Sequence, residues 1–157
     1  TPTTKLEVVG TMKTGTLQIT GGSDLAENFE TSDDIKPGMI VAIDPANPGR
    51  LVLARGAYNR RVAGIISGAN NLSAGMILPN TDPSKNSLPV ALSGRVWVFA
   101  DATKNPIKAG DLLTTSDTPG FAMKVNKFKR ANGAMIGKAM TELNSGTGLV
   151  LVLVALQ

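Results

Sequence analysis

Two carboxylates and a hydroxyl stand close together near the start of this 157-residue chain, in the segment Ser23-Asp24-Leu25-Ala26-Glu27. Hydrolysis of a peptide bond without a metal needs one carboxylate to activate water and a second group to protonate the leaving amide. Two neighbouring carboxylates raise one pKa above its usual value of about 4, which keeps that group protonated. Asp24 and Glu27 are therefore a candidate acid/base pair. Ser23 is a candidate nucleophile toward the Gly22 carbonyl, although the sequence shows no histidine or nearby lysine to activate it.

The same carboxylates also fit a purely structural role, which residue types and spacing alone favour. An acidic residue followed three positions later by glutamate is a capping-box pattern, in which each side chain accepts from a free backbone N–H of the first helical turn. The pattern predicts a one-turn helix over residues 24–29, with Leu25 and Phe29 on one face. This helix would need no catalysis to explain any of its residues.

The composition excludes several kinds of site. The chain has no cysteine and no histidine, so we expect no zinc site of the usual kind, no cofactor or metal, no thiol chemistry and no histidine-dependent triad. The net charge of +4 is scattered, and its densest cluster, Lys124, Lys127, Lys129 and Arg130, is too sparse to predict nucleic-acid binding. No apolar run reaches the roughly 20 residues of a membrane helix. The chain shows no signal peptide and no initiator methionine, so we expect a processed product or an excised fragment.

The first 22 residues predict a thin β stem. Residues 5–10 and 16–20 alternate apolar and polar side chains between glycines, which is a strand pattern. Two such short strands cannot form a core by themselves. They must lie on the following domain or pair with copies of themselves.

The remaining residues, 23–157, predict a mainly β head. Many apolar runs of strand length are separated by turn residues such as Asn47-Pro48-Gly49 and Asn132-Gly133, with no long helical period. This spacing favours a β barrel or sandwich. Trp97, inside an apolar run, is predicted to lie in the core.

The head also repeats itself, with halves of about 35–98 and 107–157. Ile35-Lys36-x-Gly38 recurs as Ile107-Lys108-x-Gly110, the turn Pro48-Gly49 as Pro119-Gly120, and the segment around Gly64 as that around Gly137, at offsets of 71 to 73 residues. A duplicated β unit explains this register. The turn-and-strand segments resemble those of β-clip-like domains, which implies two interlocked halves.

Two stretches resemble known families. Residues 1–11, TPTTKLEVVGT, are similar to shaft segments of bacterial and phage tail-fibre-like surface proteins, which are usually trimeric. The Ser-Asp-x-Ala-Glu segment, followed by the strand-like run Val62-Ala63-Gly64-Ile65-Ile66-Ser67-Gly68, resembles the autoproteolytic chaperone domain of phage neck-appendage and tail-spike proteins. This resemblance implies trimerisation of the shaft, then cleavage at Ser23–Asp24 involving Asp24 and Glu27.

Three functions follow as hypotheses. The first, which we favour, is a C-terminal trimerisation domain of an extracellular fibre or phage tail-fibre-like structural protein, at a virion or cell surface. The second is a self-cleaving intramolecular chaperone, with at most single-turnover autoproteolysis at Ser23–Asp24. The third is a head that binds a surface glycan or receptor through loops such as residues 70–73 and 81–88. We expect a homotrimer, without nucleic acid and without membrane insertion.

Overall fold

The computed structural model describes residues 5, 6, 8–32, 34–78 and 87–156, and it is mainly β, with 44% strand and 5% helix. This confirms the predicted fold class. The elements, in chain order, are β1 (Asp24–Glu30), β2 (Ile40–Ile43), β3 (Leu51–Leu53), β4 (Val62–Ile66), a 3-10 turn η1 (Ala69–Asn71), β5 (Met76–Leu78), β6 (Ser87–Asp101), β7 (Leu112–Thr115), β8 (Ala122–Lys124), α1 (Phe128–Ala131), β9 (Met135–Ala139) and β10 (Thr147–Val154).

Five strands close into a barrel in the order β6, β10, β9, β7 and β8, and the short parallel pairing of β8 with β6 completes the circle. The barrel encloses a core of fully buried aliphatic side chains that includes Val98, Ile107, Leu113, Ile136 and Val152. Closure removes most free strand edges, which lets short strands form a stable sheet.

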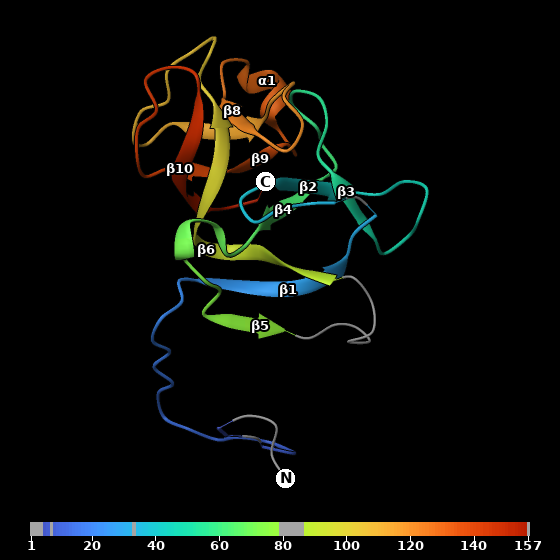
Figure 1. Cartoon of the computed structure of the whole chain (residues 1–157), viewed down its shortest axis with the longest axis vertical. Coiled ribbons are helices and arrows are strands. Elements are labelled where there is room, and N and C mark those ends of the chain that lie inside the picture. Colours follow the sequence, from blue (N-terminus) through green and yellow to red (C-terminus); the bar gives the residue numbers. More distant parts are fainter. Residues whose placement is uncertain (1–4, 7, 33, 79–86, 157) are drawn as a thin grey trace.

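A second set of strands extends from the long strand β6. One edge of the first half of β6 pairs with β4, which pairs with β2, and β2 pairs with β3. The opposite edge of β6 pairs with β1, and β1 pairs in parallel with β5. Figure 1 shows the barrel at one end of the molecule and β1 and β5 at the other, next to the N-terminal segment.

The two sequence halves have equivalent strand pairings. Val41 lies opposite Leu53 and Gly64, and 72 residues later Leu113 lies opposite Lys124 and Gly137. A register shift follows Val41 in one unit and Leu113 in the other. The shared register and the shared bulge are what a duplicated β unit requires.

The glycines of the repeated turn also adopt one geometry. Gly38 and Gly110 both have φ of +89°, and each N–H donates to a strand carbonyl at 2.8 Å, that of Ile66 or Ala139. A positive φ is accessible to glycine without the steric cost that a side chain adds. The Ile-Lys-x-Gly motif therefore marks a required backbone turn.

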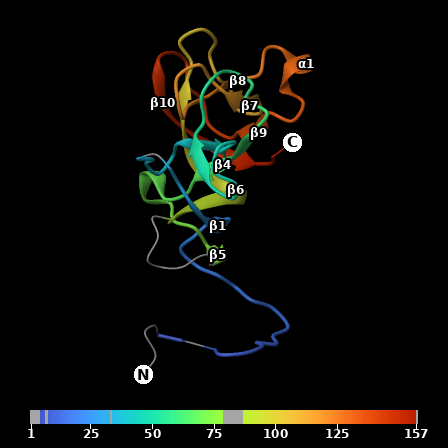
Figure 2. The same ribbon diagram turned by 90° about the vertical axis from the view of Figure 1, so that its right-hand side faces the viewer.

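The N-terminal segment departs from the sequence prediction. No described residue between Lys5 and Gly21 lies in a strand, and the apolar side chains there stay exposed, from 43% for Ile19 to 95% for Val9. The segment leaves the head near β1 and β5 and turns away from it (Figure 2). Among the described residues of the stem, the expected strands are therefore not formed, because two such short strands cannot build a core of their own.

Candidate functional site

Asp24 begins a β-strand, so the predicted capping-box helix over residues 24–29 is wrong. Seven residues from Asp24 to Glu30 form β1, with β6 on one side and β5 on the other. The capping pattern is a local signal, whereas the strand gains backbone hydrogen bonds from two neighbours that are distant in sequence. Tertiary pairing therefore overrides the local preference.

Glycines close tightly around the Ser23–Asp24 peptide. A Cβ at Gly22 would overlap the backbone at Gly75, and a Cβ at Gly94 would overlap the backbone of Ser23 and Asp24. Gly94 also has φ of +106°. Only chains without side chains at these positions can approach so closely. The candidate scissile bond thus lies in a narrow passage between β6 and the start of β5.

Backbone hydrogen bonds hold both sides of this peptide. The Arg95 N–H donates to the Ser23 carbonyl at 2.9 Å, and the Gly75 N–H donates to the Asp24 carbonyl at 2.9 Å. The Ser23 hydroxyl donates to the Arg95 carbonyl at 2.7 Å. The Arg95 amide already polarises the carbonyl that hydrolysis would attack, and the Ser23 hydroxyl is engaged in anchoring the strand.

Asp24 is a buried residue, at 5% relative exposure. The Ser67 hydroxyl donates to its Oδ1 at 3.1 Å, whereas its buried Oδ2 has no hydrogen-bond partner among the described residues. Burial raises the pKa of Asp24 above its usual value, and the hydrogen bond from Ser67 acts in the opposite direction. The raised pKa makes the protonated form of Asp24 more populated than that of an exposed aspartate at the same pH, which is a property that a proton donor needs.

Glu27 does not meet Asp24 in the single chain. Cross-strand partners share a face, and Asp24 lies opposite Gly94 whereas Glu27 lies opposite Val90. Side chains three positions apart in a strand point to opposite faces. The structure therefore places both predicted carboxylates on β1, but on different sides of the sheet.

Sequence reasoning missed Ser67, Gly75 and Gly94 as parts of this site. Ser67 is buried at 3% exposure directly after β4, and its N–H donates to the Pro89 carbonyl at 2.8 Å. The available signal was the Ser67-Gly68 pair at the end of the strand-like run, a polar residue next to a turn glycine. Nothing in the spacing along the chain indicates that it meets Asp24, 43 residues away.

Two side chains of the basic cluster at residues 124–130 contact other residues of the head. Lys124 lies 2.9 Å from Asp111, and the Arg130 guanidinium lies over the Tyr58 ring at 4.7 Å. Tyr58 also accepts from the N–H groups of Asn126 and Lys127. These contacts tie the loop around α1 to the barrel.

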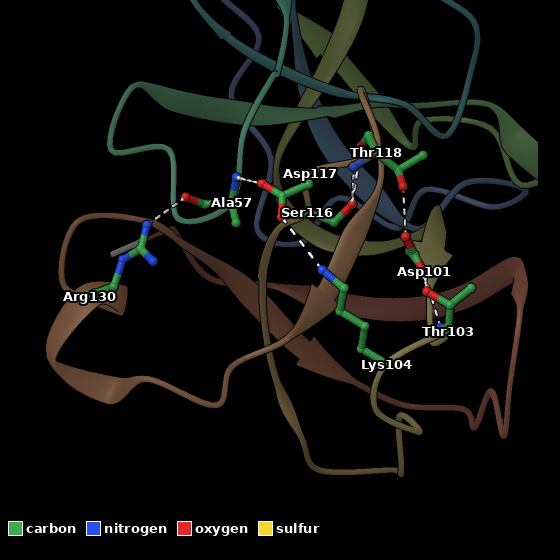
Figure 3. A network of polar contacts seen from close by, with 8 residues as sticks. All are labelled: Ala57, Asp101, Thr103, Lys104, Ser116, Asp117, Thr118 and Arg130. Atoms are coloured by element: carbon green, nitrogen blue, oxygen red, sulfur yellow. Dashed lines mark hydrogen bonds and ion pairs between the residues drawn. The ribbon is translucent and has the colours of Figure 1, made fainter.

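A polar network connects the loops at the same end of the barrel (Figure 3). Asp101 accepts from the Thr103 and Thr118 hydroxyls, both at 2.6 Å, and these bonds lower its pKa. Asp117 accepts from the Ala57 N–H at 3.1 Å and lies 3.9 Å from Lys104. The carboxylates here join neighbouring loops to one another, and a role in loop packing accounts for them.

The remaining sequence predictions have mixed outcomes. Trp97 is only half-buried and lies on the face of β6 opposite the fully buried Val96 and Val98, so its placement in the core was wrong. Most of the loop at residues 81–88 lies outside the described residues. Within the described part of the chain, no cluster of three or more acidic residues forms a candidate metal site, and no helix is long and apolar enough to span a membrane.

Comparison with known proteins gives matches in structure and none in sequence. No family model matches the chain, and no curated protein matches it. Pre-mature gene product 12 of bacteriophage phi29 has a TM-score of 0.65 and 18% identity; the match covers 93% of this chain and 23% of that protein. The C-terminal fragment of the same phage protein has a TM-score of 0.56 and 20% identity, over 84% of this chain and all of the fragment.

The chain has the fold of this phage domain. It spans about a quarter of the length of the pre-mature phi29 protein. A third structure, the phi29 head fibre gp8.5 N base, is more distant, at a TM-score of 0.48 and 14% identity over 83% of this chain and 92% of that one.

Proposed function

We propose that this chain is an assembly domain of a phage fibre-like structural protein at the virion surface, in which three copies associate through the N-terminal stem. The observation that carries the proposal is the fold, which matches the whole C-terminal fragment of phi29 gene product 12. The crystal structures of that protein are of a pre-mature form and of a C-terminal fragment. The proposal assigns this chain the corresponding terminal position in a longer fibre.

The stem supports the assembly role. It has the alternation of a strand, yet Leu17 and Ile19 are 54% and 43% exposed and lie in no strand. Burial of apolar surface contributes about 25 cal/mol per Å², so three stems that cover each other's apolar faces gain what one cannot. As strands, the backbone N–H and C=O groups of one stem would pair with those of the next.

Sedimentation velocity of the intact chain tests this proposal at micromolar concentration. We expect a trimer for the intact chain and weaker association for a chain that starts at Gly22. A stable monomer at every concentration tested would overturn the proposal.

We further propose that the domain cuts its own chain at Ser23–Asp24, because Asp24 carries a buried carboxyl with an unpartnered oxygen next to that bond. In the proposed step, a carboxylate removes a proton from water, and the water oxygen attacks the Ser23 carbonyl carbon. The protonated Asp24 carboxyl donates its proton to the leaving amide nitrogen as the C–N bond breaks. The products are a carboxylate on Ser23 and a free amino group on Asp24.

Mass spectrometry of the full chain after assembly tests the cleavage. We expect a break only at Ser23–Asp24, and its loss in Glu27→Gln, which removes the base and keeps the size and hydrogen-bonding capacity of the side chain. Glu30→Gln, at the other end of β1 and paired with Arg50 at 2.9 Å, is the matched control and should be cut normally. An intact wild-type backbone after long incubation of the trimer would overturn self-cleavage and leave the assembly role standing.

A further inference from the structure

The two carboxylates proposed for cleavage are too far apart to act together within one chain. A strand rises about 3.4 Å per residue, so the Cα atoms of Asp24 and Glu27 are about 10 Å apart. A glutamate side chain spans about half that distance. A general acid or base must approach its proton to hydrogen-bond distance or through one water. Glu27 also projects from the other face of β1, so its reach along the strand is shorter still.

Bringing Asp24 and Glu27 together by moving β1 would cost hydrogen bonds. Leu25, Ala26 and Glu27 are in register with three residues of β5, and the whole of β1 is in register with β6. The only irregularity is the step from Ser93 to Ala91, which leaves the extra residue on β6 and keeps β1 regular. A turn that folded Glu27 back toward Ser23 would break hydrogen bonds on both sides of the strand.

Asp24 is equally fixed. Its Oδ1 is held by Ser67, and its Cα lies against Gly94. By contrast, Glu27 lies at the half-exposed part of β1, where a neighbouring molecule can reach it. Within the described part of one chain, the proton donor is therefore in place and Glu27, the candidate base, is out of reach.

We propose that the base comes from a second copy of the chain: Glu27 of one protomer activates the water that cuts Ser23–Asp24 of its neighbour. This inference rests on the proposed self-cleavage. Cyclic assembly gives every protomer one neighbour that supplies Glu27 and another that receives it, so each site is completed once. The candidate bond lies at the stem end of the head, where the proposed trimer contact begins (Figure 1). Cleavage then cannot precede assembly, because an isolated chain lacks half of the machinery.

Mixed assemblies of two inactive variants test the inference. Asp24→Asn and Glu27→Gln chains carry different affinity tags and are co-expressed as full chains, and mixed assemblies are isolated through both tags. Each variant alone should stay whole. In mixed assemblies the Glu27→Gln chain should be cut, because it keeps Asp24 and receives Glu27 from its neighbour, while the Asp24→Asn chain should stay whole.

The extent of cutting should follow the mixing ratio. With random cyclic assembly into trimers, about two-thirds of the Glu27→Gln chains in the doubly tagged assemblies are cut at equal expression, and about nine-tenths when Asp24→Asn is in ninefold excess. Circular dichroism of each variant assembly verifies that the head is folded. Mixed assemblies that stay whole while wild type is cut would overturn the action of Glu27 between chains and leave self-cleavage intact. Normal cleavage of Glu27→Gln alone would also overturn it, and an uncut wild type would overturn both.

Discussion

Asp24 is a polar residue whose burial costs stability. Its carboxyl is buried beside glycines, with one hydrogen bond from Ser67 and an unpartnered Oδ2. Leaving a buried acceptor unpaired costs roughly 1 to 3 kcal/mol, and more when the group is charged. A site that only held the fold together would gain from an apolar residue here. This cost is the reason for assigning the Asp24 carboxyl a role in the proposed cleavage.

The raised pKa of Asp24 predicts how its stability contribution changes with pH. Because burial raises the folded-state pKa above the unfolded value, the folded protein favours the protonated acid. The contribution is therefore complete below the unfolded pKa of 3.8 and is lost as the pH rises through the folded pKa. We expect Asp24→Asn, which is neutral at every pH, to gain stability relative to wild type between pH 3 and pH 7.

Urea unfolding of both proteins across this range measures the difference. Both proteins contain the same other carboxylates, so the pH dependence that those groups give to the free energy of unfolding cancels in the difference. Asp101 is one of them: the hydroxyls of Thr103 and Thr118 lower its pKa, so its contribution to stability changes with pH in the opposite sense. Glu27→Gln, which also neutralises a carboxylate of β1 and is also expected to stay uncut, is the control. A constant difference between Asp24→Asn and wild type from pH 3 to pH 7 would show that Asp24 is not held in an environment that penalises its charge.

At the scale of elements, the sequence predicted the features that repeat and missed those that depend on one distant partner. The strands around Gly38 and Gly110 were predictable because each half of the chain shows the same turn and spacing, and the structure adds a bulge shared by both halves. For β1 the sequence pattern predicted a helix, because nothing in Asp24-Leu25-Ala26-Glu27 shows that β6 and β5 will lie on either side. The site was therefore predictable in its residue types and not in its geometry.

The repeated turns allow a matched test of backbone geometry against packing. Gly110 has φ of +89° and no atom within 4 Å of an added Cβ, whereas a Cβ on Gly38, at the same φ, would meet Ala69 at 3.0 Å and Phe99 at 3.3 Å. We expect Gly110→Ala to cost about 1 kcal/mol from the positive φ alone. Gly38→Ala should cost more, because its neighbours must also move.

Chemical unfolding of the two variants gives both free energies. The difference between them isolates the crowding at Gly38, since the backbone conformation is the same. If Gly110→Ala costs nothing, the turn relaxes easily and the Ile-Lys-x-Gly motif does not enforce it. If both variants cost the same, the Ala69 and Phe99 contacts are readily adjusted.

At the scale of the whole molecule, the head and the stem differ in what they can do alone. The head closes a barrel and buries its own core, with Val98, Leu113 and Val152 fully inaccessible. The stem places Leu6, Val9 and Leu17 in solvent and forms no strand among its described residues. The two parts should therefore respond differently to dilution and to mutation: the head as a folding unit, the stem as an association unit.

A pair of stem variants tests that division. In the strand pattern of residues 16–20, Leu17 and Ile19 share one face and Gln18 lies on the other. Leu17→Asp places a charge on the face proposed to lie between copies, and Gln18→Asp places the same charge on the opposite face. We expect Leu17→Asp to weaken trimerisation by at least tenfold in sedimentation experiments, Gln18→Asp to leave it nearly unchanged, and the thermal unfolding of the head to be the same in both. If both variants weaken trimerisation equally, the cause is net charge rather than a buried stem face. If neither variant changes trimerisation, the contact between copies lies on the head.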